Sequence, residues 1–384
     1  MKALQIERSL TRFAAARVAG RPTPLRLAEI NPPELPAPGW ELVRPRLAGI
    51  CGSDLATVSG RSSRWFEPIV SFPFVPGHEV VADTADGRRV VVEPVLHCAI
   101  RGVDPPCPPC TAGRTNHCER LVTGHLGAGL QTGYCCDTGG GWSLALAAHP
   151  AQLHDVPDGW TDEAAVMVEP TACAVHAALL PPPAPTGRVA VIGAGTIGLA
   201  TIAAVHRLRE DVTSLTAVAK HPDQRRLARE LGATSVVAPG ELRRAVRRAT
   251  GSWMLENGQL TGGADVVYDC VGSGESIAEA LAVVAPGGTV VLAGMPGPVG
   301  IDLTPLWQRE IRLVGAYAYG PEPAQGGRHS FELAMEVVDA AGLGRLVSGF
   351  YSLDRYADAI DHASSAGRRG AAKIVFDLRN EKRR

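Results

Sequence analysis

Four cysteines lie close together in one Pro- and Gly-rich stretch, in the pattern Cys98-x8-Cys107-x2-Cys110-x7-Cys118. Thiolates at such spacing on a turn-rich loop are the usual ligands of a closed, structural zinc site. The alternative is a redox pair at Cys107 and Cys110, but no thioredoxin-like β-α-β pattern surrounds it. The chain has nine cysteines in 384 residues, an odd number that does not suit a disulfide framework. The pattern therefore predicts a structural zinc.

A second set of metal-binding residue types is dispersed along the chain. Its three segments are residues 49–54 with Cys51, Ser53 and Asp54, residues 76–79 with His78 and Glu79, and residues 168–170 with Glu169. Each segment alone is a weak signal, because a single cysteine is most often packed in a core and a single glutamate most often solvated. Taken together, Cys, His and Glu on loops are the ligands of a catalytic zinc that keeps one position open.

A glycine pattern, G-x-G-x-x-G, directly follows an apolar run and opens a helix-like segment. In that context the first glycine permits a tight turn, the second lets a pyrophosphate approach the backbone, and the third allows close packing of helix on strand. The free N–H groups of the helix N-terminus then favour the phosphates. The pattern predicts a dinucleotide site, and the alternative is a plain strand-to-helix turn. The site residues in this turn are Gly193, Gly195, Thr196, Ile197 and Gly198.

The end of the next apolar run, Leu215–Ala219, decides which dinucleotide is preferred. An NAD(H) site usually has an acidic residue there, which binds the ribose 2′-hydroxyl. Here Lys220, His221 and Arg225 follow the run, and the first carboxylate, Asp223, comes four residues past its end. Cations at this point suit a 2′-phosphate, although Lys220 and His221 could also form an ordinary solvated loop. We therefore expect NADP(H), with NAD(H) as the less favoured cofactor.

The segments that position these residues show two different sequence patterns along the chain. Residues 1–150 carry short β-like runs between turns, among them 41–47, 79–83 and 89–93. A helix is expected over 162–180, and Pro181–Pro185 then reads as a linker. Beyond it, short apolar strands alternate with helices, which predicts a parallel, doubly wound sheet. The expected elements are strands 188–192, 215–219, 235–237, 264–270, 289–293 and 311–315, and helices 196–209 and 222–231. The C-terminal segment does not continue this alternation of strands and helices. Its expected elements are helices 330–341 and 353–365 and a strand 372–378.

The composition excludes several functional classes. Lys and Arg total 38 against 39 Asp and Glu, and aromatic residues make up only 5% of the chain, which argues against nucleic-acid binding. The longest apolar stretch, 189–205, contains three glycines and is better explained as strand, turn and helix than as a membrane span. The N-terminus has no apolar core of a signal peptide. We expect a cytoplasmic protein that binds neither membrane nor nucleic acid.

These motifs resemble, in type and in order, those of the zinc-dependent medium-chain dehydrogenase/reductase family, which includes the alcohol and polyol dehydrogenases. The matching segments are G-I-C-G-S-D at 49–54, G-H-E at 77–79, the four-cysteine lobe, E-P at 169–170 and G-A-G-T-I-G at 193–198. The resemblance spans essentially the whole chain. It implies an α/β fold, with a GroES-like, β-rich catalytic domain over 1–180 and 321–384. A Rossmann domain with a doubly wound parallel sheet would span 181–320.

The resemblance also implies roles for single residues. Cys51 and His78 would bind the catalytic zinc, Glu79 would be a ligand or near-ligand, and Glu169 would fill the fourth position directly or through water. A glutamate at position 169 resembles the pattern of the polyol and sugar dehydrogenase branch of this family. Ser53 would hydrogen-bond the substrate oxygen and begin a proton relay. Cys173, Gly272 and Gly294 would face the cofactor.

Three departures from the family pattern are visible. The histidine that often ends the relay is replaced by Ala56, so the proton must leave through water or another group. Ala82 stands where a glycine is usual. Eight residues separate Cys98 from Cys107 where many relatives have two, which makes Cys98 the least secure of the four predicted ligands.

The functional hypothesis is a zinc-dependent oxidoreductase that transfers hydride between NADP(H) and an alcohol or carbonyl, with a polyol or sugar-like secondary alcohol as the candidate substrate. We expect a small-molecule substrate, two zinc ions per chain, and a homodimer or homotetramer. The alternatives are a non-catalytic cofactor-binding or regulatory member of the fold, and a zinc-free quinone-type reductase.

Four aromatic residues on loops have two alternative interpretations. Trp65, Phe66, Tyr134 and Trp142 would either line a substrate pocket or pack in a core or lid. Tyr134 and Trp142 belong to a glycine-rich stretch, Gly124–Ser143, for which the sequence suggests no mechanism.

Overall fold

A computed structural model describes residues 1–19 and 24–381 and divides the chain into two compact units. Unit 1 comprises Met1–Glu169, Gly344–Ala366 and Lys373–Arg384, and unit 2 comprises Pro170–Leu343 and Gly367–Ala372. Each unit has its own sheet and core. No helix in the described part of the chain is long and apolar enough to cross a membrane.

Unit 2 is built on a parallel sheet of six strands in the order β10-β9-β8-β11-β12-β13. The strands are β8 (Arg188–Ile192), β9 (Ser214–Val218), β10 (Ser235–Val237), β11 (Ala264–Asp269), β12 (Val284–Leu292) and β13 (Arg312–Gly315). The order runs outward from β8 in both directions, so the chain reverses at that strand, as in a doubly wound sheet. The prediction of this sheet is confirmed, with strand ends within a few residues of those expected.

Helices connect these strands and cover the sheet. They are α6 (Thr196–Leu208), α7 (Pro222–Glu230), α8 (Leu242–Thr250), α9 (Gly274–Val283) and α10 (Thr304–Gln308). One apolar core lies between the sheet and α8 and α9, where Val267, Val246 and Ile277 pack together. Because both faces of such a sheet are covered, its strands are continuous apolar runs, which is why the sequence predicted them well.

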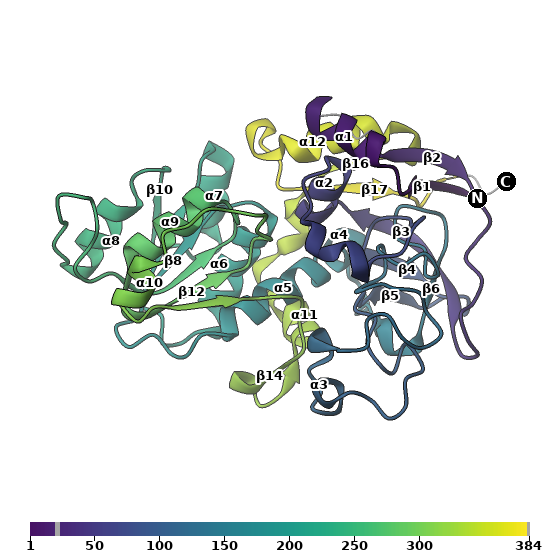
Figure 1. The fold of residues 1–384 in the computed structure, drawn as a ribbon, viewed down its shortest axis with the longest axis horizontal. Helices are drawn as coiled ribbons and strands as arrows, with labels where there is room; N and C mark the ends of the chain where they lie inside the picture. The colour runs from purple at the N-terminus through teal and green to yellow at the C-terminus, as the bar shows by residue number, and fades with distance from the viewer. Residues whose placement is uncertain (20–23, 382–384) are drawn as a thin grey trace. The chain divides into compact units, whose positions relative to one another are not determined.

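Unit 1 is a mixed sheet to which both ends of the chain contribute. Its order is β16-β17-β3-β4-β5-β7, with β6 also paired to β3. The strands are β3 (Glu41–Gly49), β4 (Val80–Asp83), β5 (Arg89–Val92), β6 (Leu146–Ala148), β7 (Leu153–Asp155), β16 (Val347–Tyr351) and β17 (Lys373–Asp377). Val375 of β17 lies opposite Gly49 of β3. Figure 1 shows the yellow C-terminal strands within the purple and blue N-terminal part of the ribbon.

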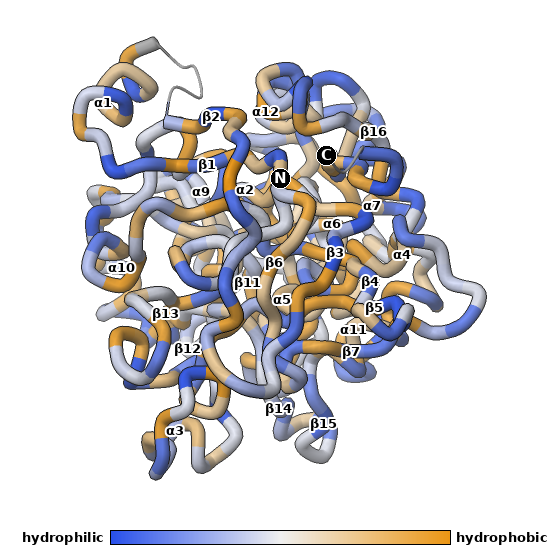
Figure 2. Tube along the Cα trace, turned by 90° about the vertical axis from the view of Figure 1, so that its right-hand side faces the viewer, coloured by the Kyte–Doolittle hydropathy of each residue, from blue (hydrophilic) through white to orange (hydrophobic). Residues whose placement is uncertain are grey.

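The remaining elements of unit 1 are short. A separate hairpin joins β1 (Lys2–Ile6) to β2 (Leu25–Glu29), and α1 spans Leu10–Ala19. Helix α2 (Gly52–Val58) follows β3 directly, and α12 (Tyr356–Ser364) packs on β16 and β17. Val80, Val90 and Val43 form the core beneath the sheet. In Figure 2 such apolar strand segments are orange, whereas the connecting turns are mainly blue.

The helix expected over 162–180 is two helices, α4 (Asp162–Ala165) and α5 (Val168–Leu179). Pro170 explains the break, because a proline has no N–H to bond the carbonyl of residue 166 and is tolerated only in the first turn of a helix. Glu169 therefore lies in the first turn of a new helix.

The limits of the two units also differ from those expected at 180/181 and 320/321. Helices α5 and α11 (Ser330–Ala341) pack with the parallel sheet: the Tyr268 hydroxyl of β11 donates to the carbonyl of Ala178 at 2.9 Å, and α11 packs on α6. Residues 367–372 also belong to unit 2, where the hydroxyl of Thr196 donates to the carbonyl of Ala372 at 2.8 Å.

Candidate functional site

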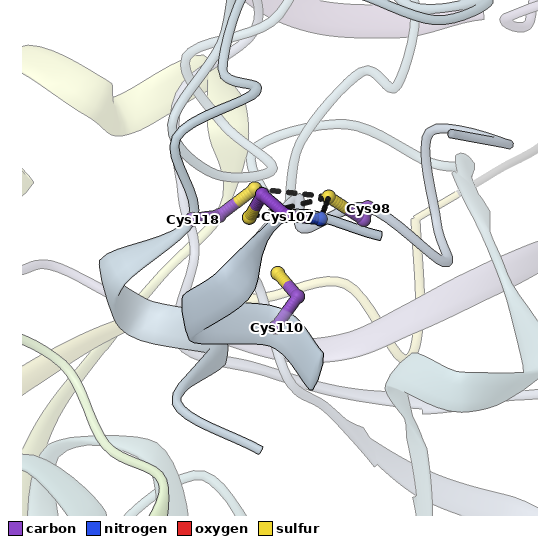
Figure 3. Close-up of side chains that lie close together, drawn as sticks. All are labelled: Cys98, Cys107, Cys110 and Cys118. Carbon is purple, nitrogen blue, oxygen red and sulfur yellow. Dashed lines mark hydrogen bonds between the residues drawn. The ribbon is translucent and has the colours of Figure 1, made fainter. Parts of the chain in front are cut away.

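The four cysteines of the predicted structural zinc site come together in unit 1. Their sulfur atoms all lie within 4.8 Å of one another, with Cys98 Sγ 3.5 Å from Cys107 Sγ and 3.7 Å from Cys118 Sγ. Figure 3 shows the four side chains directed toward a common centre. Cys98, Cys107 and Cys118 are buried, Cys110 is half-buried, and none is in a disulfide. Four converging thiols are the donor set of a tetrahedral zinc site, so the residues fit this metal.

Local structure explains this convergence. Cys107 is the N-cap of α3 (Pro108–Thr111), which carries Cys110, and Cys118 ends the 3-10 helix Thr115–His117. Backbone N–H groups also point at the sulfurs, among them that of Glu119, 3.4 Å from Cys107 Sγ. Burial raises the pKa of Cys107, but hydrogen bonds, first that from Glu119, outweigh it and the pKa falls to about 7. Thiolate, the form that binds metal, is therefore favoured at Cys107, whereas burial raises the pKa of Cys110 and raises that of Cys118 to about 11.

The longer spacing after Cys98 brings a buried arginine into this lobe. Arg101 is fully buried and donates to backbone carbonyls of the glycine-rich stretch and its flanks. The carbonyls belong to Leu96, Thr123, Leu126, Gly127 and Gly129. Burial lowers the pKa of Arg101, and the nearby cysteines, Cys135 first, oppose this. These hydrogen bonds anchor the glycine-rich stretch Gly124–Ser143, for which the sequence suggested no mechanism, to the four-cysteine lobe.

Cys51 and His78 lie side by side, and Cys51 directly precedes α2. Cys51 is the N-cap of α2, and its N–H donates to Asp54 Oδ2 at 3.0 Å. His78 is 4% exposed; its Nδ1 lies 3.5 Å from Asp54 Oδ1, and the Cys51 thiol lies close to its ring. Burial lowers the pKa of His78, but the neighbouring Asp54, first of all, and Cys51 raise it well above its ordinary value. A thiol and an imidazole backed by a carboxylate fit a zinc site.

Glu79 is engaged by a lysine that the sequence did not single out. Lys373, the first residue of β17, is 2% exposed, and its Nζ lies 2.7 and 2.5 Å from the two carboxylate oxygens of Glu79. The same Nζ donates to the carbonyl of Ile50 at 3.3 Å. Gly49 makes room for this pair, because a Cβ there would lie 1.8 Å from Glu79 Oε2. A lysine directly before the apolar run 374–376 was the only sequence signal for it.

Glu169 lies near the same lysine. It is 5% exposed in the first turn of α5. Burial lowers the pKa of Lys373, but the negative charges of Glu79, Cys51 and Glu169 outweigh it and raise the pKa. In the described ranges, however, the four-cysteine lobe is the one group of three or more His, Cys, Asp or Glu residues whose ligand atoms all lie within 4.8 Å of one another. The ligand atoms of Cys51, His78 and Glu169 therefore do not all lie within this distance of one another. Cys173 is half-buried and belongs to unit 2.

Ser53 and the aromatic residues have distinct places. Ser53 is half-buried in the first turn of α2. The Tyr134 hydroxyl donates to Asp54 Oδ1 at 3.3 Å, beside the predicted ligands. Trp142 is fully buried and its Nε1 donates to the carbonyl of Gly49, so it is a core residue, whereas Trp65 is 80% exposed.

In unit 2 each glycine of the G-x-G-x-x-G pattern has a separate steric reason. Gly193 has a φ of +95°, which a tight turn requires and other residues rarely adopt. At Gly198 a Cβ would lie 1.9 Å from the carbonyl oxygen of Gly193, so only glycine allows α6 to pack this closely. At Gly195, the N-cap of α6, a Cβ would have no neighbour within 4 Å, so open space remains above the helix N-terminus. This is the geometry of a pyrophosphate site.

The other residues assigned to the cofactor also lie at the carboxyl edge of the sheet. Gly272 follows β11 with a φ of +76°, and a Cβ at Gly294 would lie 2.6 Å from the N atom of Val271, so these loops pass in close contact. Lys220 is exposed just after β9, and Arg225 is folded back, its Nε donating to the carbonyl of Ala219 at 3.0 Å. The hydroxyl of Thr196 is bonded to Ala372, and Ile197 lies in the first turn of α6.

Sequence families match both parts of this chain. Residues 37–158 match the alcohol dehydrogenase GroES-like domain, and residues 196–340 match the zinc-binding dehydrogenase domain. These ranges lie in the β-rich unit and the parallel-sheet unit, respectively. The expected combination of a GroES-like domain with a Rossmann domain is therefore confirmed.

Individual proteins agree with this assignment. The chain is 29% identical over 312 residues to sorbitol dehydrogenase of Arabidopsis thaliana, covering 76% of this chain and 78% of that protein. It is 27% identical over 374 residues to L-idonate 5-dehydrogenase of Vitis vinifera, covering 92% and 93%. A solved zinc-binding dehydrogenase of Sinorhizobium meliloti 1021, bound to NADP, superposes with a TM-score of 0.69 at 24% identity, covering 98% and 99%. The chain thus belongs to the zinc-dependent medium-chain dehydrogenase/reductase family and is a zinc- and nicotinamide-dependent dehydrogenase of the alcohol dehydrogenase type.

Proposed function

We propose that this enzyme oxidises a polyol-like secondary alcohol, or reduces the corresponding carbonyl, with NADP(H) as its preferred cofactor and two zinc ions per chain. The observation that carries the proposal is the placement of Cys51 against His78, with Asp54 behind the imidazole and Glu169 close by. The names of the relatives, sorbitol and L-idonate dehydrogenases, support a polyol-like substrate.

The residues divide the work of this reaction. Cys51, His78 and Glu169 would hold the catalytic zinc, and Cys98, Cys107, Cys110 and Cys118 would hold the structural one. When bound, zinc supplies a positive charge that stabilises negative charge developing on the substrate oxygen. Ser53 would hydrogen-bond that oxygen, and the α6 N-terminus would orient the dinucleotide through its phosphates. Because both carboxylate oxygens of Glu79 are bonded to Lys373, we propose that Glu79 acts beside the metal rather than as a permanent ligand.

The cofactor preference rests on the end of β9. Lys220 is exposed there and no carboxylate lies at the strand tip, because Asp223 is already in the first turn of α7. A 2′-phosphate would be stabilised by such a cation, whereas a 2′-hydroxyl would lack its usual acceptor.

The decisive experiment is a screen of alcohols, polyols, ketones and aldehydes with each of the two cofactors. We expect turnover of a polyol or related secondary alcohol with NADP⁺, slower turnover with NAD⁺, and loss and recovery of activity on chelation and readdition of zinc. Cys51→Ala should abolish turnover and leave the fold intact. Dinucleotide binding without turnover of any compound would favour a non-catalytic protein, and activity after complete metal loss would favour a quinone-type reductase.

The oligomeric state is a separate proposal. We infer a homodimer or homotetramer, supported by the edge strand β13 and by the exposed Leu303 and Trp307, which precede it in the chain. Light scattering on the eluting protein would measure the mass directly.

A further inference from the structure

Oxidation of an alcohol releases a proton that needs a way out of the site. The substrate carbon gives hydride to the nicotinamide, and the hydroxyl proton must reach water for the reaction to balance. Ala56 provides no side chain that could carry it, although it lies five residues after Cys51 on the same helix, α2. The question is which groups of this chain replace that carrier.

A tyrosine hydroxyl lies next to the serine that would contact the substrate. Tyr134 is 9% exposed, and its hydroxyl is hydrogen-bonded to the side chains of Thr57 and Asp54. The Ser53 side chain lies near enough to the phenol to lower its pKa. The Tyr134 oxygen lies 3.2 Å from Thr57 Oγ1. Burial, and then the Asp54 charge, raise the pKa of Tyr134 well above its ordinary value, so the phenol stays protonated in the resting enzyme.

The chain of hydroxyls continues from Thr57 to the surface. Thr57 Oγ1 lies 2.9 Å from Ser62 Oγ, and Ser62 is half-buried within a loop whose neighbour Arg61 is exposed. The N–H groups of Arg61 and Ser62 both donate to the carbonyl of Ala56, at 2.8 and 3.2 Å. The loop after α2 thus folds back over Ala56 and brings the Ser62 hydroxyl to Thr57.

We propose that Ser53, Tyr134, Thr57 and Ser62 form a proton relay that carries the substrate proton from the active site to solvent. The inference rests on the proposed function, and it assigns catalytic work to a tyrosine of the glycine-rich stretch and to two hydroxyl residues near Ala56. All four residues belong to unit 1.

The proton moves by exchange along the chain. Ser53 turns its hydroxyl toward Tyr134 and, as it takes the hydroxyl proton of the substrate, passes its own proton to the Tyr134 oxygen. The phenol proton then goes to Thr57, the Thr57 proton to Ser62, and the Ser62 proton to water. Each oxygen gains one proton as it loses one, so no phenolate needs to form. Two rotations prepare the path: the phenol proton turns from Asp54 to Thr57, and the Thr57 proton turns from the carbonyl of Ser53, which it bonds at 2.9 Å, to Ser62. Both are rotations about a single C–O bond.

Hydroxyl-deleting variants test the relay in the zinc-loaded enzyme. We expect Tyr134→Phe and Thr57→Val to lower kcat for alcohol oxidation at least about tenfold, with KM little changed, because a positioned proton carrier is lost. The solvent deuterium isotope effect on kcat should rise in both, since proton departure becomes limiting. Thr57→Ser, which keeps the hydroxyl, should restore most of the rate. Ser62→Ala should have a smaller effect, because water can replace its exposed end.

Matched controls delete hydroxyls elsewhere in unit 1. Thr138→Val removes a buried threonine hydroxyl that bonds only the backbone carbonyls of Cys135 and Gly139. Tyr351→Phe removes a tyrosine hydroxyl bonded to His362 at 2.9 Å. Both should keep the kcat and isotope effect of the unaltered enzyme. Zinc content and NADPH affinity should be the same in all variants.

A second measurement is independent of turnover. The chain has six tyrosines, so protein labelled with [4-¹³C]tyrosine gives few signals, and Tyr134→Phe identifies the one from Tyr134. In metal-free protein, Thr57→Val and Ser53→Ala should both shift this signal, and Thr138→Val should not. An unmoved signal would overturn the relay, as would full kcat with an unchanged isotope effect in Tyr134→Phe. If the unaltered protein oxidises no alcohol, the proposed function fails, and the ¹³C signal alone decides whether the hydroxyl chain exists.

Discussion

At the scale of single residues, the buried pair of Lys373 and Glu79 shows how a charge can be kept inside unit 1. Neither side chain is more than 2% exposed, and the Lys373 Nζ is bonded to both carboxylate oxygens of Glu79. Removing one partner leaves an uncompensated buried charge, which typically costs about 3–5 kcal/mol. We therefore expect Lys373→Met to lower the free energy of unfolding of the zinc-loaded protein by that amount, measured by urea denaturation.

Two further variants separate the pair from general damage. Glu79→Gln combined with Lys373→Met should cost less than the sum of the single changes, because neither charge is then left alone. Lys2→Met, which breaks an ion pair with the half-exposed Asp354, should change stability little. Additive effects of Glu79→Gln and Lys373→Met would show that the two side chains do not act as a pair.

The glycines of the dinucleotide turn give a second residue-scale prediction, in which two neighbours differ. Gly198→Ala places a Cβ 1.9 Å from the Gly193 oxygen, so the strand and α6 must move apart, at a cost of about 2–3 kcal/mol or more in unfolding free energy. Gly195→Ala meets nothing within 4 Å, so stability should be kept, while NADPH affinity falls at least about tenfold because the methyl occupies phosphate space.

Thermal unfolding and NADPH fluorescence titration measure both effects. Gly297→Ala is a control, since a Cβ there also has no neighbour within 4 Å and the residue is not assigned to the pyrophosphate. If Gly195→Ala bound NADPH as tightly as the unaltered protein, the phosphates would not lie on the α6 N-terminus.

At the scale of elements, the four-cysteine lobe is a loop that metal must hold in place. Its only regular pieces are α3 and one 3-10 turn, so it has little packing of its own. Cys110→Ser should lower the zinc content by one ion per chain and lower the unfolding temperature of unit 1 by about 10 °C, because metal binding here contributes folding free energy. Cys136→Ser is the matched control, as Cys136 is exposed and outside the cluster.

Plasma emission spectrometry and calorimetry provide these two measurements. Equal zinc content in Cys110→Ser and in the unaltered protein would contradict the structural zinc site. Alcohol turnover distinguishes the two metals, since Cys110→Ser should retain activity at low temperature whereas Cys51→Ala should not.

Elements also differ in how far the sequence could predict them. The parallel strands were predictable because they are buried on both faces and read as unbroken apolar runs; β8 and β10 occupy the expected residues. Helix α1 was missed because most of its residues from 10 to 18 are exposed, and strand β2 because its burial does not alternate regularly. The continuous helix over 162–180 was wrong because the restriction at Pro170 was overlooked.

The candidate site shows the same division. Residues in short motifs, such as Cys51, His78 and the four cysteines, could be picked out because their types and spacing are unusual. Lys373, Tyr134 and Thr57 could not be picked out in this way, because their roles depend on contacts with residues 294, 80 and 77 positions away in the chain, respectively, which no local pattern encodes. The discontinuous β-rich domain was expected from the family resemblance, and the pairing of Val375 with Gly49 is the contact that realises it.

At the scale of the whole molecule, two units with separate cores and separate ligand sites need not unfold together. The four-cysteine lobe and Cys51 belong to unit 1, whereas the glycine turn belongs to unit 2. A ligand that binds only the folded form of one unit stabilises that unit, by about 2.7 kcal/mol at a concentration 100 times its Kd. We therefore expect calorimetry to resolve two transitions, with zinc removal lowering one and NADPH raising the other.

The tryptophans assign each transition to its unit. Trp40 and Trp142 are buried in unit 1, whereas Trp253 and Trp307 are exposed in unit 2. The change in tryptophan fluorescence that accompanies exposure of the buried pair on heating should therefore follow the zinc-sensitive transition. Cys110→Ser should reproduce the effect of zinc removal on that transition alone, and Gly195→Ala should abolish the NADPH effect on the other. A single transition that responds equally to both ligands would mean that the two cores unfold as one cooperative body, despite their separate sheets.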